Sequence, residues 1–275
     1  MALTIESRIL LNDGNKIPVL GLGVWQASPG KETRRAVGYA LERGYRLIDT
    51  ARMYGNEKDV GAAVRESGIP REEIFVTTKL WNTDHGYEAA LRAFAASRGD
   101  LGLEYVDLYL IHWPVPRLRH ESWKAFLKLR EDGLARSIGV SNYTIAHLQE
   151  LLPTTSIPPS VNQVEFHPFL YQRELLEFCR AHGIQLEAYS PLTRGRRLGH
   201  PVIVDIAAKY RRTPAQVLIR WSLQHGLVVI PKSARPERIR ENASVFDFEL
   251  QSQDMARLDS LDERSHVAWN PDDLP

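Results

Sequence analysis

The chain has 275 residues, of which 43% are hydrophobic and 25% are charged, and its formal net charge is +1. This composition is ordinary for a globular protein. Because the charge is close to neutral, the sequence favours neither a nucleic acid nor an anionic membrane as a partner.

The N-terminus begins MALTIESRILLNDG, without a basic segment followed by an apolar one, so we expect no signal peptide. No run approaches the ~18 apolar residues of a membrane-spanning helix. The single cysteine, Cys179, excludes an internal disulfide and makes a cysteine-based zinc site improbable, so we interpret it as a core thiol. We therefore expect a cytoplasmic protein without a bound metal.

Short apolar runs recur along the chain, and each is followed by a longer amphipathic segment. The runs are VLGLGV at 19, RLIDT at 46, IFVTTKL at 74, VDLYLIHW at 106, ARSIGVS at 135, VNQVEF at 161, IQLEAYS at 184 and LVVIPKS at 227. Several helix-like segments between them end in glycine, as the C′ position of a helix prefers, at Gly44, Gly133 and Gly183. A strand spacing of roughly 30 residues is typical of βαβ units.

Eight apolar strands alternating with helices predict an α/β fold in which a parallel sheet closes into a (β/α)8 TIM barrel. We expect residues 1–275 to form one domain. The opening ESRILLNDGNKIPVL predicts a β-hairpin, with its turn at residues 12–15, that closes the barrel floor. A doubly wound sheet is the competing architecture, but GLGVW after the first run lacks its G-x-G-x-x-G fingerprint. Low helix propensity at residues 98–100 (RGD) predicts that the third long helix ends early.

Polar side chains stand at the C-terminal ends of seven of the eight strands. Such groups are costly within apolar strands unless they are paired, and the C-terminal rim is where barrel enzymes carry their chemistry. The sequence therefore predicts a functional site at this rim. Its polar residues are Asp49, Lys79, His112, Ser141, Asn142, Gln163, Tyr189, Ser190, Lys232 and Ser233.

The stretch IDTARMYGNE places Asp49 at a strand end and Tyr54 five residues later, in the following loop. We expect Lys79 to pair with Asp49 and to lower the pKa of Tyr54, because a nearby ammonium favours the phenolate. Tyr54 would then serve as a general acid, with His112 polarising the same oxygen. Singly, each residue has a structural interpretation: a barrel ion pair, a core histidine or a packing tyrosine. All four at successive strand ends favour catalysis.

Long segments also resemble the aldo-keto reductase family, in the family's order and over nearly the whole chain. They include RLIDTARMYGNEKDVG, VTTKLWNTDHG, LGLEYVDLYLIHWP, SIGVSNY, VNQVEFHP, EAYSPL and VIPKSARPERIRENASVFDFEL. The sequence looks most like bacterial reductases of the 2,5-diketo-D-gluconate reductase type. The resemblance implies a barrel that binds a nicotinamide cofactor without a Rossmann domain, and a catalytic tetrad of Asp49, Tyr54, Lys79 and His112.

The resemblance also implies a cofactor groove. Its residues would be Ser141, Asn142 and Gln163 at the nicotinamide carboxamide, Tyr189 on the nicotinamide ring, Ser190 and Leu192 beside the pyrophosphate, Lys232, Ser233, Arg235 and Arg238 at the adenosine 2′-phosphate, and Glu241 and Asn242 at the adenine. The segment KSARPER brings three cations close to an expected helix start, which favours a phosphate. We therefore expect NADPH (NADP+) rather than NADH.

Trp25, Trp81 and Trp113 follow three of the strands and predict an aromatic substrate pocket. Trp269 lies in the C-terminal tail, which borders the pocket in similar proteins. The resemblance implies a monomeric reductase of small aldehydes, α-dicarbonyls and keto sugars such as 2,5-diketo-D-gluconate.

Two other classes of function remain open at this point. One is a sensor that binds the cofactor but turns over little substrate. A damaged tetrad would favour this hypothesis. The other is an aldolase-like enzyme with Lys79 or Lys232 as Schiff-base nucleophile.

Overall fold

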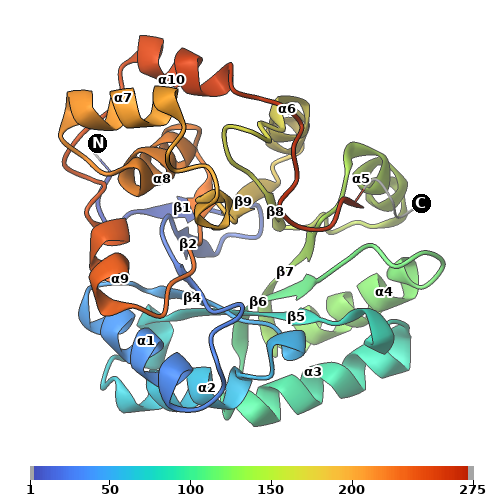
Figure 1. The fold of residues 1–275 in the computed structure, drawn as a ribbon. Coiled ribbons are helices and arrows are strands. Elements are labelled where there is room, and N and C mark those ends of the chain that lie inside the picture. Colours follow the sequence, from blue (N-terminus) through green and yellow to red (C-terminus); the bar gives the residue numbers. More distant parts are fainter. Residues whose placement is uncertain (1–2, 272–275) are drawn as a thin grey trace.

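A computed structural model describes residues 3–271, and its centre is a sheet of eight parallel strands (Figure 1). Each strand lies beside its sequence neighbours, in the order β10-β9-β8-β7-β6-β5-β4-β3. The strands are β3 (Leu22–Gly23), β4 (Leu47–Asp49), β5 (Phe75–Leu80), β6 (Val106–Ile111), β7 (Ala135–Ser141), β8 (Val161–Glu165), β9 (Gln185–Tyr189) and β10 (Val228–Val229). All eight apolar runs of the sequence thus contain a strand, as predicted.

The sheet is curled, and isolated bridges and hydrogen bonds link the segments around its first and last strands. Parallel bridges join Leu20 to Val229 and Gly23 to Lys232. Gly21 N donates to Val229 O at 2.9 Å, and Val229 N donates to Val19 O at 2.9 Å. Consequently the C-terminal ends of all eight strands face one common space.

Helices surround the strands in Figure 1. They are α1 (Lys31–Glu42), α2 (Glu57–Glu66), α3 (Tyr87–Leu101), α4 (Arg119–Glu131), α5 (Ile145–Leu151), α6 (Arg173–Ala181), α7 (Pro201–Tyr210), α8 (Pro214–Gln224), α9 (Pro236–Ala243) and α10 (Ser252–Asp259). Local sequence sets their ends. For example, α8 begins with a capping box between Thr213 and Gln216, with proline at its first position. After α1 the chain turns away at Gly44, where φ is +91°.

The predicted early end of the third long helix was wrong, because α3 continues through residues 98–100 to Leu101. Its buried face, which includes Phe94, Ser97 and Leu101, extends across the low-propensity residues, so packing outweighs propensity there. Gly61 of α2 lies against the end of this helix. A Cβ at Gly61 would lie 1.8 Å from the Leu101 carbonyl oxygen, so only glycine allows this approach.

The N-terminal hairpin forms as predicted, from β1 (Arg8–Leu10) and β2 (Lys16–Pro18). In its turn, Asp13 accepts a 3.0 Å hydrogen bond from Asn15 N. Asn15 Nδ2 reaches Arg136 O at the start of β7, and Ile17 packs with apolar side chains from inside the sheet. The hairpin therefore covers the N-terminal ends of the strands and leaves their C-terminal ends open.

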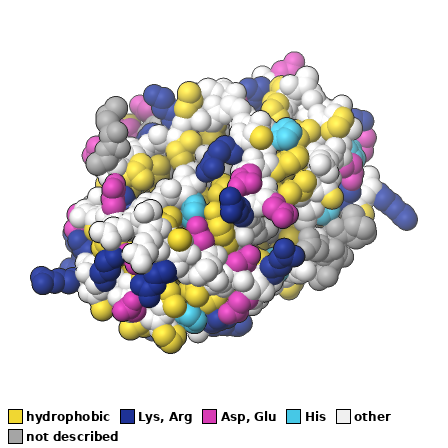
Figure 2. Space-filling model, turned by 90° about the horizontal axis from the view of Figure 1, so that it is seen from above, with side chains coloured by type: hydrophobic (Ala, Val, Ile, Leu, Met, Phe, Trp, Pro, Cys, Tyr) yellow, Lys and Arg dark blue, Asp and Glu magenta, His cyan; other side chains and the backbone are white. Residues whose placement is uncertain are grey.

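The surface carries charges of both signs. On the face shown in Figure 2, basic and acidic side chains are intermingled, in keeping with the net charge of +1. Within residues 3–271, none of the helices has both the length and the apolar character needed to cross a bilayer.

Candidate active site

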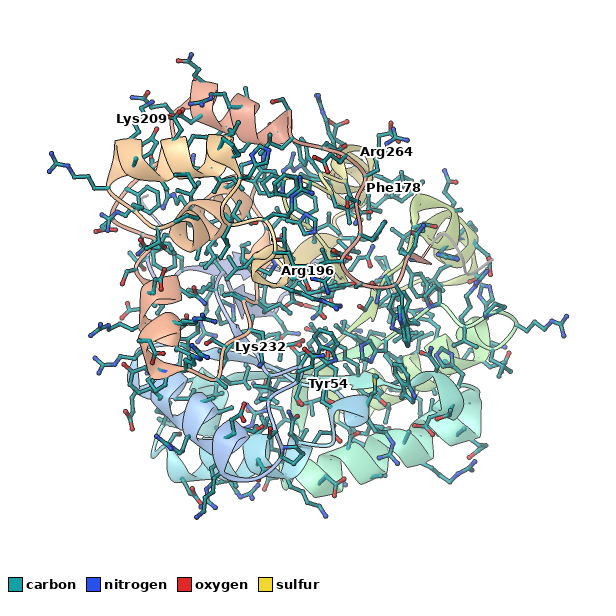
Figure 3. The ribbon with its side chains drawn as sticks, in the orientation of Figure 1. Tyr54, Phe178, Arg196, Lys209, Lys232 and Arg264 are labelled. Carbon is teal, nitrogen blue, oxygen red and sulfur yellow. The ribbon has the colours of Figure 1, made fainter. Side chains whose placement is uncertain are left out.

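A cavity of about 1170 Å³ opens at the C-terminal ends of the strands. Every site residue predicted from the sequence lines this cavity except Lys79, which is fully buried beneath it. In Figure 3, Tyr54 and Lys232 lie in the central region enclosed by the helices, while Lys209 and Phe178 lie near the periphery. The fold therefore brings together segments from β3 to the C-terminal tail around one space.

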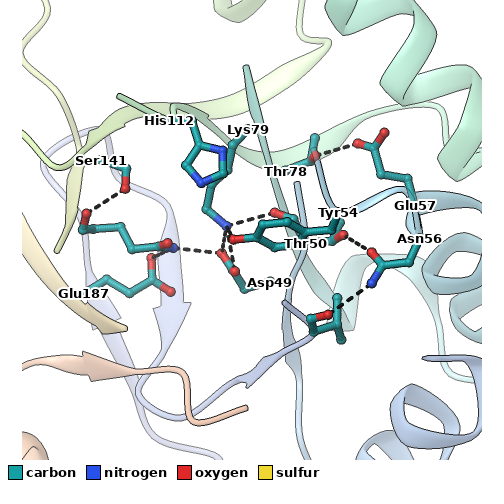
Figure 4. A network of polar contacts seen from close by, with 12 residues as sticks. Asp49, Thr50, Tyr54, Asn56, Glu57, Thr78, Lys79, His112, Ser141 and Glu187 are labelled. Carbon is teal, nitrogen blue, oxygen red and sulfur yellow. Dashed lines mark hydrogen bonds and ion pairs between the residues drawn. The ribbon is translucent and has the colours of Figure 1, made fainter. Parts of the chain in front are cut away.

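Lys79 and Asp49 form a buried ion pair at the base of this cavity (Figure 4). Lys79 Nζ lies 2.7 and 2.8 Å from the two carboxylate oxygens of Asp49 and 2.9 Å from the carbonyl oxygen of Thr50. A buried ammonium is tolerated when its donors are satisfied in this way. The predicted pairing of Lys79 with Asp49 is thus observed.

Tyr54 reaches the same ammonium from the loop after β4. Its hydroxyl oxygen lies 3.4 Å from Lys79 Nζ. A 3-10 turn (Arg52–Tyr54) followed by Gly55, at φ +67°, carries the chain back over the cavity. Asn56 anchors this turn, since its side chain accepts from Thr50 Oγ1 at 2.7 Å and donates to Val24 O at 3.0 Å. The spacing in IDTARMYGNE therefore places a phenol above a carboxylate and ammonium pair.

The expected lowering of the Tyr54 pKa was wrong. Burial raises the pKa of Tyr54 above its usual value, and the Lys79 ammonium offsets only part of that effect. The nearby Asp49 carboxylate adds to the rise. Burial alone would lower the pKa of Lys79, but Asp49 and Tyr54 together raise it. Tyr54 is consequently protonated and Lys79 charged at neutral pH.

His112 follows β6 and faces Tyr54 across the cavity. The two rings lie 5.8 Å apart at 75°, and Trp81 contacts the other side of His112 at 5.2 Å. Burial, with a smaller effect from the Lys79 charge, holds the pKa of His112 well below its usual value. His112 is therefore neutral at pH 7, and one of its ring nitrogens carries a proton that it can donate.

The residues expected at the nicotinamide carboxamide are held by one another. Ser141 Oγ donates to Gln163 O at 2.8 Å, and Asn142 Nδ2 donates to His112 O at 2.9 Å. Tyr189 Oη donates to Asn142 Oδ1 at 2.8 Å. Asn142 adopts φ +62°, a conformation that asparagine tolerates better than most residues. These hydrogen bonds hold the three side chains in place.

Glu187 is a buried carboxyl in β9 that the sequence analysis missed. It is 0% exposed, and its Oε2 accepts from Gln163 Nε2 at 3.2 Å (Figure 4). Burial, reinforced by the Asp49 charge, raises the pKa of Glu187 to about 8. The signal was available, because IQLEAYS places a glutamate inside an otherwise apolar strand.

The far end of the cavity is basic. Lys232, Arg235 and Arg238 precede or begin α9, are exposed, and take part in no ion pair within residues 3–271. Ser233 Oγ accepts from Arg235 N at 3.1 Å, and Lys232 Nζ donates to Gln26 O at 3.2 Å. Glu241 and Asn242 of α9 line the same end. Uncompensated cations beside a helix N-terminus form a suitable environment for a phosphate.

The loop after β9 borders the cavity between its two ends. Ser190 and Leu192 lie on its lining, and Ser190 has φ +49°. Farther along this loop, the Arg194 guanidinium stacks 4.4 Å from the ring centre of Trp25. This loop thus contacts the segment after β3 across the cavity rim.

Three tryptophans form an aromatic wall beside Tyr54 and His112. Trp269, from the C-terminal tail, lies 6.5 Å from Trp81 and 5.6 Å from Trp113 between ring centres. Trp25 lines the cavity separately, beside Arg194. Among residues 3–271 there is no group of three or more His, Cys, Asp or Glu side chains suited to a metal ion.

Comparison with known proteins establishes the family. The model of the Aldo/keto reductase family matches residues 19–263. The chain is 49% identical over 274 residues to the glyoxal reductase of Bacillus subtilis (strain 168), covering 100% of this chain and 99% of that protein. This chain therefore belongs to the aldo/keto reductase family, and it is an oxidoreductase.

Solved structures agree with this assignment. MGS-M4, an aldo-keto reductase from a Medee basin deep-sea metagenome library, superposes with a TM-score of 0.94 at 45% identity, covering 98% of this chain and 100% of that chain. A Bombyx mori aldo-keto reductase in complex with NADP superposes with a TM-score of 0.91 at 37% identity, covering 98% and 97%.

Proposed function

We propose that this protein is an NADPH-dependent carbonyl reductase with Tyr54 as its general acid. One observation carries the proposal: a protonated phenol, a buried ammonium 3.4 Å from its oxygen and a neutral histidine meet at one end of a large cavity. Reduction of a carbonyl group to an alcohol needs a proton donor for the oxygen, and the conjugate base of that donor must be stabilised. The phenol supplies the proton, and the ammonium stabilises the phenolate.

The cavity suits a dinucleotide phosphate. Its volume of about 1170 Å³ exceeds the ~300–1,000 Å³ typical of small-molecule pockets, leaving room for a cofactor and a substrate together. Ser141, Asn142, Gln163 and Tyr189 would hold the nicotinamide end. Ser190 and Leu192 would flank the pyrophosphate, and Lys232, Ser233, Arg235 and Arg238 the 2′-phosphate. Glu241 and Asn242 would contact the adenine.

When bound, NADPH would supply a hydride from its nicotinamide C4 to the carbonyl carbon. Tyr54 gives its phenolic proton to the carbonyl oxygen, and the phenolate left behind is stabilised by Lys79. Asp49 fixes the Lys79 ammonium beside the phenol. Neutral His112 orients the carbonyl oxygen by donating a hydrogen bond to it. Solvent then returns the proton to Tyr54.

The aromatic wall supports small carbonyl substrates. Trp81, Trp113 and Trp269 offer apolar surface close to Tyr54. Small aldehydes, α-dicarbonyls and keto sugars such as 2,5-diketo-D-gluconate are the candidate classes, and the relative named glyoxal reductase supports the α-dicarbonyls. Turnover of methylglyoxal with NADPH, followed at 340 nm, tests this part of the proposal.

A Schiff-base mechanism is less consistent with the geometry. A nucleophilic lysine must be neutral, whereas Asp49 and Tyr54 raise the pKa of Lys79. Lys232 lies at the basic end of the cavity, outside the group formed by Tyr54 and His112. A borohydride trap in the presence of substrate should therefore yield no covalent adduct.

A fluorescence titration with NADPH and, separately, NADH is the first test of the cofactor assignment. We expect tight NADPH binding and weaker NADH binding, because only NADPH carries the 2′-phosphate. Failure to bind either nucleotide would overturn the reductase assignment. Equal affinities would instead remove the role assigned to Lys232, Ser233, Arg235 and Arg238.

We also propose that residues 1–275 form a single barrel domain. The bridges from Leu20 to Val229 and from Gly23 to Lys232 support closure of the sheet. A single cooperative unfolding transition, coincident by far-UV circular dichroism and tryptophan fluorescence, is the expected behaviour. We expect a monomer by light scattering.

A further inference from the structure

Glu165 is a buried carboxylate that the reaction proposed above does not use. It is the last residue of β8, and its side chain is 1% exposed. His167 Nε2 lies 2.9 Å from its Oε1, and His266 Nδ1 lies 3.4 Å from its Oε2. The carboxylate therefore sits between two histidines, one of which belongs to the C-terminal tail.

The same carboxylate accepts two hydrogen bonds from the tail backbone. Val267 N donates to Oε1 at 2.7 Å, and Ala268 N donates to Oε2 at 3.0 Å. Each oxygen of Glu165 thus holds one of two successive peptide N–H groups. Burial would raise the pKa of Glu165, but the two histidines and the Val267 N–H outweigh it and lower the pKa to about 2. At neutral pH the acceptor is therefore fully ionised.

The residue after this pair is Trp269, part of the aromatic wall. This residue is 63% exposed, so burial alone does not fix its position. The tail runs from α10 past β8 in Figure 1. Upstream, Glu263 N and Ser265 N donate to Phe169 O at 3.2 and 3.0 Å. The contacts to Glu165 hold the backbone directly before Trp269.

We propose that Glu165 is a specificity-determining positioning residue: its carboxylate accepts hydrogen bonds from the backbone N–H groups of residues 267 and 268, a contact called the clasp below, and thereby holds Trp269 against Trp81 and Trp113. This inference rests on the proposed carbonyl reductase function. A wall fixed in this way gives an aromatic apolar surface on the cavity that Tyr54 also lines, which favours carbonyl compounds with an aromatic substituent over those with a methyl group.

The substitution Glu165→Gln tests the clasp with little change of shape. Glutamine has one oxygen, so only one of the two N–H groups keeps its acceptor, and the new amide group faces the other donor. Glu263→Gln is the matched control, because it makes the same chemical change in the same tail at an exposed ion pair with Arg197. Hydrogen exchange measured on a tail peptide should become at least about tenfold faster in the first variant and not in the second.

Kinetics with phenylglyoxal and methylglyoxal test the role in specificity. For Glu165→Gln we expect kcat/KM for phenylglyoxal to fall about threefold to tenfold, mainly through KM, with little change for methylglyoxal or for NADPH binding. Trp269→Ala should reproduce this pattern. The double variant should be no worse than Trp269→Ala alone, because Glu165 acts through that ring. Additive losses, or an unchanged preference, would overturn the proposal.

Replacing Glu165 takes the carboxylate away from buried His167 and partly buried His266, so two further variants guard against a folding defect. Ala268→Pro removes one of the clasped N–H groups and leaves Glu165 intact, whereas Ala268→Ser keeps the N–H. Only the proline variant should shift the preference between the two dicarbonyls. If the wild-type protein reduces neither compound, the proposed function fails. An active wild type with an unaffected proline variant would instead overturn the clasp alone.

Discussion

Gln163 Nε2 donates a 2.8 Å hydrogen bond to Asp49 Oδ2, although 114 residues separate them in the chain. The same amide group reaches Glu187 at 3.2 Å. Through this side chain, the ion pair of Asp49 and Lys79 is continuous with the strands expected to bind the nicotinamide (Figure 4). A change at one end of this network should therefore be detectable at the other.

Replacing Glu187 by glutamine should alter how stability depends on pH. The charged or titratable groups that face Glu187 are Asp49, Lys79 and Tyr54. The pKa of Glu187 is raised to about 8 in the folded protein, whereas an unfolded glutamate titrates near ~4.3. Between these values the unfolded chain loses a proton that the folded chain keeps, so the free energy of unfolding falls as pH rises through this window. The variant should show a shallower fall.

Urea denaturation at pH 5 and pH 8 measures this difference. Glu177→Gln is the control, because Glu177 lies on the exposed face of α6 and, within residues 3–271, forms an ion pair only with Arg173. The same pH dependence in Glu187→Gln and wild type would show that Glu187 titrates normally.

Removing the Tyr54 hydroxyl should abolish most of the reduction. A positioned general acid contributes about 10²- to 10⁴-fold, so we expect kcat of Tyr54→Phe to fall within that range while NADPH affinity stays unchanged. Tyr171→Phe, at a half-buried tyrosine outside the cavity, serves as the control. Near-normal turnover in Tyr54→Phe would remove the acid role from this residue.

Breaking the buried pair from one side should destabilise the fold. Lys79→Met leaves the Asp49 carboxylate without its ammonium, and such losses typically cost about 3–5 kcal/mol. The double variant Asp49→Asn with Lys79→Met should recover part of that stability, because no uncompensated charge remains. Chemical denaturation of the three proteins checks this order. A double variant less stable than Lys79→Met would contradict the explanation.

Arg238 and Arg240 of α9 offer a matched pair for testing the phosphate end of the cavity. Arg238 lines the cavity and Arg240 does not, although both are exposed. Loss of a charge-assisted contact with a phosphate should weaken NADPH binding roughly tenfold in Arg238→Ala, with little effect on NADH. Arg240→Ala should bind both nucleotides as the wild type does. Fluorescence titrations at fixed ionic strength compare the affinities, and equal losses in both variants would argue for a non-specific charge effect.

The sequence by itself determined the strand and helix order, the hairpin and most of the polar residues at the cavity. Apolar periodicity and turn residues act locally, so a run such as VDLYLIHW identifies β6 without knowledge of its neighbours. The rule that strand ends meet at one rim then brought Asp49, Lys79 and His112 together. The end of helix α3 could not be predicted in this way, because packing across residues 98–100 outweighs their low helix propensity.

Only the tertiary structure decided the electrostatics and the distant contacts. The Tyr54 pKa rises because the surrounding protein removes water from the phenol. The spacing of residues in the sequence predicted that the Lys79 ammonium lies near this phenol, but it did not predict how deeply the phenol is buried. The hydrogen bond from Gln163 to Asp49 and the clasp from Glu165 to the tail both join segments about 100 or more residues apart. Desolvation and long-range hydrogen bonds depend on how atoms from remote segments pack, and no local pattern in the chain encodes that packing.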